Sequence, residues 1–322
     1  LFVITARLQM INGFNSYVIN EAVYYYTPLI FIIVYSQISD EQDVETILNY
    51  LFVLYIIVFL KNFAGQFTLA NLKSISFANS YSPFESELAF VFLIFECFYL
   101  YMGKRKNAII SLILCILSFK RISMLAAIVF FIFSKWIVVK KAVNKKIVIV
   151  TTVVFVLLPV LTCLMLNDTL EARFYQTFHV TLNEITLTRS SRIEAVINSG
   201  QIKYGLGSVT TYLTKYLNAL HGSNFSNRNL HNDLVKIYLE CGILGSIVFT
   251  YIYMKAASVS RMLFVMMCYI FFECYFNHLF GAGSTGIWIL IYLIMSIAGM
   301  TTRNAESDGG ENGANNGLYT DI

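Results

Sequence analysis

The run LHNDLVKIYLECGILGSIVFTYIYM at residues 230–254 places His231, Asn232 and a carboxylate directly before a mostly apolar stretch. That stretch is long enough for a helix that crosses the hydrocarbon core of a bilayer, which takes about 20 residues. A basic loop punctuated by glycine precedes it and contains Arg189-Ser190-Ser191-Arg192 and Tyr204-Gly205-Leu206-Gly207. The sequence therefore predicts a charged site placed against a membrane.

The composition of the whole chain also indicates a membrane protein. Of the 322 residues, 57% are hydrophobic and 13% are charged, whereas a soluble domain carries about 25% charged residues. Backbone polar groups must be paired inside a bilayer, so we expect helices. The predicted fold is an all-α polytopic bundle of about nine or more transmembrane helices, with one large external loop that contains short amphipathic helices. The apolar runs lie near residues 22–38, 47–61, 86–102, 107–119, 121–139, 147–166, 232–254, 261–278 and 285–300.

The charged loops predict how these helices are oriented. If the spans alternate, the basic loops at 104–106, 140–146 and 255–261 all fall on one side, which the positive-inside rule identifies as cytoplasmic. The polar tail after residue 300 has too little apolar surface to fold alone. The predicted segments are N-terminal transmembrane helices at 1–166, a large periplasmic loop at 167–230, C-terminal transmembrane helices at 231–300 and a disordered cytoplasmic tail at 301–322.

Several other classes of protein and site are disfavoured. The net charge is only +4 and no basic cluster is interleaved with aromatic residues, so a nucleic-acid partner is not expected. All six cysteines lie inside apolar runs, which disfavours disulfides and metal sites. The Gly281–Gly286 run fits GxGxxG but joins two membrane helices, so we interpret it as an external turn. Residues 1–13 do not resemble a signal peptide, which leaves a truncated span or an unusual start codon to explain Leu1.

The external loop carries a candidate anion-binding helix. Between Thr188 and Ser199, the apolar side chains share one helical face, while Arg189 and Arg192 share another. The planar guanidinium fork matches phosphate oxygens, which suits a diphosphate at the membrane interface. The alternative is a solvated face attracted to anionic lipid.

Residues before and within the next span complete this candidate site. Gly205 and Gly207 permit a close approach of backbone to ligand, or form an ordinary turn. His231 could accept a proton from an attacking hydroxyl near neutral pH, or it and Asn232 could simply cap the helix. Glu240 lies about two turns further along, and we expect it to pair with one of the arginines.

A second basic feature stands between two earlier spans. Lys120 and Arg121 fall on the predicted external side, where basic residues are normally sparse. An arginine in that position suggests an anionic partner, because burying it in hydrocarbon costs about 2.5–3.5 kcal/mol on insertion scales. The alternative is a pair of side chains that extend to the lipid headgroups.

Four groups of residues, taken in order, resemble a known family. They are Ser118-Phe119-Lys120-Arg121, then Arg192, then the turn at 204–207, and then Leu230-His231-Asn232 with Glu240-Cys241-Gly242-Ile243-Leu244-Gly245. This order is similar to that of the O-antigen polymerase and ligase superfamily of bacterial envelopes. There, an S-x-x-R corner, an Arg, a G-x-G turn, an H-N pair and an E-x-G-I-x-G run flank a large periplasmic loop. The sequence departs from the family where an aromatic residue often follows the upstream Arg.

The resemblance implies a metal-independent, cofactor-free glycosyltransferase of the bacterial inner membrane with a periplasmic active site. We expect it to polymerise undecaprenyl-diphosphate-linked oligosaccharide repeat units into O-antigen or capsular polysaccharide. His231, Arg192 and Arg121 would be catalytic: the arginines would stabilise the departing diphosphate and His231 would serve the acceptor hydroxyl. Membrane lipids and a chain-length regulator and flippase of the same pathway are further expected partners. The expected substrate-binding residues are Arg189, Gly205, Gly207, Asn232 and Glu240.

Two other activities and one non-enzymatic role remain open at this point. A ligase that transfers finished glycan to lipid A core or to protein would use the same donor chemistry. A lipid-linked oligosaccharide flippase or other transporter could also use arginines and glycine-interrupted helices within the membrane. A membrane scaffold would leave the surface glycan unchanged when the gene is deleted.

Overall fold

The structure is a computed structural model of the chain. It describes residues 2–12, 17–38, 40–66, 68–74, 84–166, 168–181, 189–199, 205–221, 230–280 and 286–297. Over these ranges every regular element is a helix and there is no strand, as the composition predicted. The tail at 301–322, Tyr204 and most of the turn at 281–286 lie outside the described residues.

Each of the nine predicted apolar runs contains a helix. Three of these helices are long and apolar enough to cross a membrane, namely α3, α9 and α14, and three shorter ones are also apolar, namely α5, α7 and the Gly286–Ile297 helix. A helical membrane protein is therefore supported, whereas nine complete crossings stay a prediction. The helices at the nine runs are α2 Val18–Ile38, α3 Glu41–Gln66, α5 Leu88–Tyr101, α6 Arg105–Leu117, α7 Arg121–Ile132, α9 Lys145–Met165, α14 Asp233–Ala257, α15 Arg261–Phe276 and Gly286–Ile297.

The chain folds as two compact units. The first comprises residues 1–29, 144–256 and 267–285, and the second comprises residues 30–143, 257–266 and 286–322. The first unit thus contains the whole loop between α9 and α14, with helices α10 (Asp168–Phe178), α12 (Arg189–Asn198) and α13 (Ser208–His221), and also the N-terminal helix α1 (Phe2–Asn12).

The loop helices of the first unit are held by an apolar core of their own. Ile193 and Val196 of α12 are buried against a stripe on α13 formed by Val209, Leu213 and Leu217. These three residues recur every four positions, which puts them on one helical face. The amphipathic helix predicted from the sequence is therefore confirmed as α12, with Arg189 and Arg192 outside this apolar core.

The interior of the first unit nearer to α14 is aromatic. Tyr25, Phe249, Tyr253 and Phe280 pack with ring centroids 4.9–6.0 Å apart, mostly edge to face. Such pairs contribute about 0.5–1.5 kcal/mol each beyond their burial. These ring contacts hold the segment after α15 beside α14, and this segment contains part of the candidate site.

Helix α14 is broken at Gly242, where φ is 67° and ψ is −179°. This combination is essentially restricted to glycine, so the E-x-G-I-x-G run encodes a break in the helix at its first glycine. At the second glycine, Gly245, an added Cβ would clash with the Cβ of Cys241. Gly242 thus interrupts the helix, and Gly245 leaves no room for a side chain beside Cys241.

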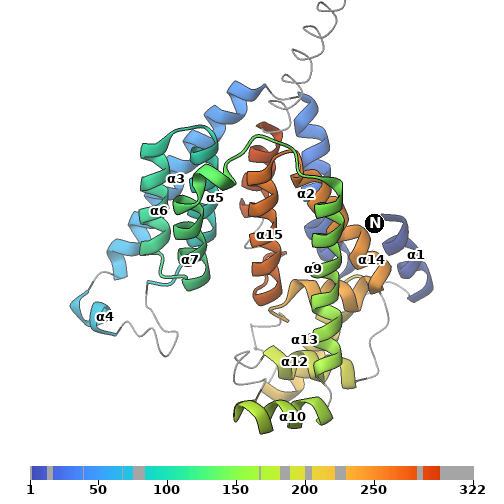
Figure 1. Cartoon of the computed structure of the whole chain (residues 1–322). Coiled ribbons are helices and arrows are strands. Elements are labelled where there is room, and N and C mark those ends of the chain that lie inside the picture. Colours follow the sequence, from blue (N-terminus) through green and yellow to red (C-terminus); the bar gives the residue numbers. More distant parts are fainter. Residues whose placement is uncertain are drawn as a thin grey trace, which may run out of the picture. The chain divides into compact units, whose positions relative to one another are not determined.

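The second unit contains α3, α5, α6, α7 and two short helices, α4 (Leu69–Lys73) and α8 (Ser134–Ile137). Helices α5, α6 and α7 pack on one another, as Figure 1 shows. At the corner before α7, the Ser86 N–H donates to Ser118 O at 3.0 Å and the Lys120 ammonium lies 4.4 Å from the centre of the Phe90 ring. Phe119 has a left-handed φ of 50°. The S-x-x-R corner is thus an ordered turn that starts α7 at Arg121.

Candidate functional site

Helix α12 positions the first pair of predicted site residues. The Arg189 guanidinium donates a hydrogen bond from Nη1 to the carbonyl of Phe276, at the end of α15. Because the last carbonyls of a helix are unpaired and carry partial negative charge, this contact is favourable. Burial lowers the pKa of Arg189, the charge of Glu273 raises it, and Arg192 lowers it. Burial also lowers the pKa of Arg192. Both remain cations at neutral pH, because free arginine has a pKa above 12.

His231 shares this environment with the two arginines. Burial lowers the pKa of His231 to about 4. The charges of Arg192, Arg189 and His278 also lower this pKa, whereas the charge of Asp233 raises it. The imidazole is therefore neutral near pH 7, and its role as the base that accepts a proton stays a prediction. Its φ of 54° lies in the left-handed region, which histidine adopts more readily than most residues but still uncommonly.

Asn232 caps helix α14. Its Oδ1 accepts the backbone N–H of Val235 at 3.0 Å, and its carbonyl accepts the N–H of Lys236 at 3.1 Å. These are the contacts of an N-cap residue, and asparagine is among the best residues for that position. Capping was the alternative interpretation of the His-Asn pair, and the structure assigns it to Asn232. A contact of Asn232 with substrate stays a prediction.

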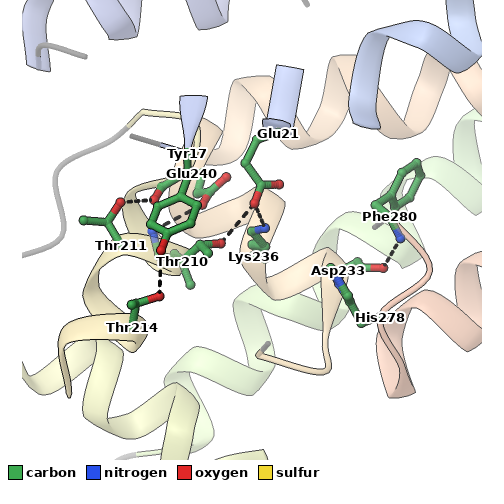
Figure 2. Close-up of polar contacts among 12 residues, drawn as sticks. Tyr17, Glu21, Thr210, Thr211, Thr214, Asp233, Lys236, Glu240, His278 and Phe280 are labelled. Carbon is green, nitrogen blue, oxygen red and sulfur yellow. Dashed lines mark hydrogen bonds and ion pairs between the residues drawn. The ribbon is translucent and has the colours of Figure 1, made fainter. Parts of the chain in front are cut away.

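The residue after the cap, Asp233, binds the segment that follows α15. Its Oδ1 lies 2.6 Å from His278 Nδ1, and its Oδ2 accepts the N–H groups of Leu279 at 2.6 Å and Phe280 at 2.9 Å. The Asp233 side chain is only 1% exposed, and Figure 2 shows it directed at this segment. Both carboxylate oxygens are thus used within the fold.

The Gly-Leu-Gly turn docks on the break in α14. The Gly205 N–H donates to Glu240 O at 2.7 Å, while Glu240 Oε1 accepts the N–H of Val209 at 3.2 Å. Gly205 and Gly207 have φ values of 149° and 75°, which favour glycine. The two glycine motifs are therefore in direct contact. The Gly205 N–H pairs with the carbonyl of Glu240 just before the break, and the Glu240 carboxylate caps α13.

Glu240 is the one candidate residue whose contacts differ from the expectation. It was expected to pair with an arginine, yet its carboxylate contacts backbone amides at the start of α13. The physical reason is that the first N–H groups of a helix have no partners within the helix and need an acceptor. The roles of Gly205, Gly207 and Glu240 in binding substrate stay predictions beside these structural ones.

Four contributors to this region were not singled out by sequence reasoning. Lys236 of α14 and Glu21 of α2 form an ion pair in which both side chains are 5% exposed, and Thr210 Oγ1 donates to Glu21 Oε1 at 3.0 Å (Figure 2). Gln9 of α1 accepts the N–H of Leu206 at 3.1 Å. A lysine within an apolar run was a detectable signal, because ionisable residues at membrane depth are usually paired. Its partner is 215 residues away, and nothing in the local sequence identifies it.

The structure thus brings Arg189, Arg192 and His231 together within the first unit, next to Asp233 and His278. Arg121 belongs to the second unit, at the first position of α7. Its participation in the same site stays a prediction.

The fold and this cluster define a class: a helical membrane protein with a cationic site on the loop that precedes a broken apolar helix. Residues 107–250 match a family model described as O-Antigen ligase. The match includes Arg121, Arg192, His231 and Glu240, and it supports the resemblance of this region to the O-antigen polymerase and ligase superfamily. No curated protein and no solved structure matches the chain significantly.

Proposed function

We propose that this protein is a glycosyltransferase that polymerises undecaprenyl-diphosphate-linked oligosaccharide repeat units into O-antigen or capsular polysaccharide. One arrangement carries the proposal: Arg189 of α12 donates to the carbonyl of Phe276 at the end of α15, and Asp233, two residues after His231, contacts His278 in the segment that follows Phe276. Glycosyl transfer from a diphosphate needs cations for the leaving group and a base for the acceptor. The family match supports the broader class, a polymerase or a ligase.

The proposed reaction assigns one task to each group. An acceptor hydroxyl attacks the anomeric carbon of the donor sugar, and the new glycosidic bond forms as the bond between that carbon and the diphosphate oxygen breaks. His231 takes the hydroxyl proton, and the electron pair of the broken bond leaves on the diphosphate. Arg192 and Arg189 stabilise its growing negative charge through charge-assisted hydrogen bonds. Arg121 is proposed to add a third cation. Side chains thus supply the positive charge, and we propose a reaction that needs neither a metal ion nor a cofactor.

The proposed location is the bacterial inner membrane, with the loop at residues 167–230 on the periplasmic side. The basic loops on the opposite side support this orientation. Lipid-linked donor would then reach the arginines from the outer leaflet. A flippase that delivers the donor and a regulator of chain length are the proposed partners from the same pathway.

The test is the glycan profile of a deletion strain complemented with variants. Arg192→Ala and His231→Ala should each abolish long polymer while the amount of protein in the membrane stays normal. Arg173→Ala, an exposed arginine on α10 in the same unit, is the matched control and should restore wild-type chain lengths. Normal chain lengths with both site variants would contradict the assigned roles.

The closest alternative is a ligase, because the matching family model carries that description. The species that accumulates in the deletion strain separates the two activities: single repeats on the final acceptor indicate a polymerase, and lipid-linked polymer indicates a ligase. Elongation of lipid-linked repeats by purified protein in detergent would exclude transport as the activity measured, since no bilayer is then available to cross.

A further inference from the structure

His278 has the geometry of a histidine oriented by a carboxylate. Its Nδ1 contacts Asp233 Oδ1 at 2.6 Å, and the other oxygen of Asp233 is held by two backbone N–H groups. An acceptor at Nδ1 places the imidazole proton there and fixes the ring plane. The side chain of His278 is 17% exposed, whereas that of Asp233 is 1% exposed. The pair therefore has a buried anchor and a partly accessible ring.

The surroundings of His278 belong to the candidate site. Arg189 donates to the carbonyl of Phe276, only two residues before His278. His278 also acts on the ionisation of His231, together with Arg189 and Arg192. The segment after α15 thus reaches the cationic cluster from an element 45 residues away from Asp233 in the sequence.

We propose that His278, oriented by Asp233, is a further substrate-contacting residue that binds the diphosphate of the donor through Nε2. This inference rests on the proposed function, since it assigns the chemistry of the leaving group. As the bond between the anomeric carbon and the diphosphate oxygen breaks, the imidazolium donates its Nε2 hydrogen bond to a diphosphate oxygen. His231 receives the acceptor proton. The two histidines therefore act at opposite ends of the transfer.

The charge state required of His278 agrees with its surroundings. Helix α15 ends at Phe276, so His278 lies in the segment beyond it. Burial acts to lower the pKa of His278, but the charge and hydrogen bond of Asp233 outweigh burial and raise it. The protonated form is thus favoured at His278 and the neutral form at His231, which is the division of roles that acid and base require. The other charged groups that act on His278 or on its cluster are Lys236, Glu21, Glu273, Arg189, Arg192 and His231.

The test is the pH dependence of diphosphate binding by the purified full-length protein in detergent. The probe is farnesyl diphosphate, a short polyprenyl diphosphate, and its affinity is measured from about pH 5.5 to about pH 8.5, where histidines titrate. Wild-type affinity should fall by about tenfold as His278 loses its proton, which is the effect of losing one charged hydrogen bond. The probe itself gains negative charge over this range, so its own titration would strengthen binding and cannot imitate the fall.

Three variants define the source of the effect. His278→Gln should bind about tenfold more weakly than wild type at the acidic end, without the fall at higher pH. His278→Arg keeps a permanent cation and should bind over the whole range without the fall. Asp233→Asn should move the midpoint of the fall to lower pH, because the neutral amide no longer stabilises the imidazolium. His179→Asn, at an exposed histidine with a left-handed φ that asparagine tolerates, is the control and should match wild type.

Equal affinity and an equal pH profile for wild type and His278→Gln would overturn the inference, as would the absence of any binding by wild type. Glycan transfer assays separate this outcome from failure of the proposed function. If wild type elongates lipid-linked repeats and His278→Gln elongates them equally well, the function stands and the role of His278 is refuted. If farnesyl diphosphate binds in a His278-dependent way but wild type transfers no glycan, the diphosphate site stands and the proposed function fails.

Discussion

Replacing Lys236 by methionine should destabilise the protein more than any substitution of its ion-pair partner Glu21. The Lys236 and Glu21 side chains are both 5% exposed, and the charge of Lys236 also acts on Glu240, which is fully buried. Lys236→Met therefore leaves the buried Glu21 carboxylate without its cation, and removal of one partner of a buried pair costs about 3–5 kcal/mol. Glu21→Gln leaves Lys236 beside Glu240 and should cost less. The double variant should be less destabilising than Lys236→Met, because the Glu21 charge that Lys236→Met leaves without a partner is then absent.

The measurement is the free energy of unfolding in mixed micelles, from titration with a denaturing detergent followed by far-ultraviolet circular dichroism. Lys215→Met, at an exposed lysine on α13 in the same unit, is the control and should change this free energy by less than about 0.5 kcal/mol. The reasoning is refuted if Lys236→Met is no more destabilising than the control, or if Glu21→Gln destabilises more than Lys236→Met.

Four further predictions concern the break, the base, the cap and the topology. Gly242→Ala should destabilise by about 1–3 kcal/mol because of its φ and ψ, whereas Gly65→Ala, with nothing within 4 Å of an added Cβ, should be neutral; thermal unfolding compares them. On the acidic side, kcat/KM should fall only near the pKa of about 4 for His231, and a fall centred at the ordinary value of 6.5 would contradict its burial beside Arg192. Asn232→Asp should keep stability while Asn232→Ala loses about 1 kcal/mol of stability, measured by unfolding. Reporter fusions within residues 167–230 should report an external location, and a cytosolic signal would refute the assigned orientation.

The helical elements were predictable because they depend on the local sequence. Apolar runs of sufficient length identified the regions of α3, α9 and α14, and the spacing of Ile193 and Val196 identified the buried face of α12. Each of these inferences needs only the periodicity of the helix and the burial of apolar side chains. The boundary after α15 was less accurate, because the expected apolar run extends to residue 278 whereas the helix ends at Phe276, before the polar Asn277.

The contacts that complete the site could not be predicted in the same way, since they join distant elements. His278 and Asp233 are 45 residues apart, and Lys236 and Glu21 are 215 residues apart. A single sequence contains no information on which of several buried carboxylates a given cation contacts. Glu240 illustrates this: its position two turns along α14 was inferred correctly, but its partner was decided by the unpaired amides of α13, a helix in another part of the chain.

The three consecutive residues 231–233 show why motif residues need not all touch substrate. Asn232 must place its side chain over the first turn of α14, and Asp233 must direct its carboxylate at the segment after α15. These two contacts fix the backbone immediately after His231. They thereby hold His231 at its left-handed φ of 54°, a conformation that needs support from the surrounding structure. The imidazole that we propose as the base is thus positioned by its neighbours. This is why Asn232→Asp, which preserves the cap oxygen but removes the amide hydrogens, separates a positioning role from direct binding: full activity indicates positioning, and loss of activity with unchanged stability indicates that the amide contacts the substrate.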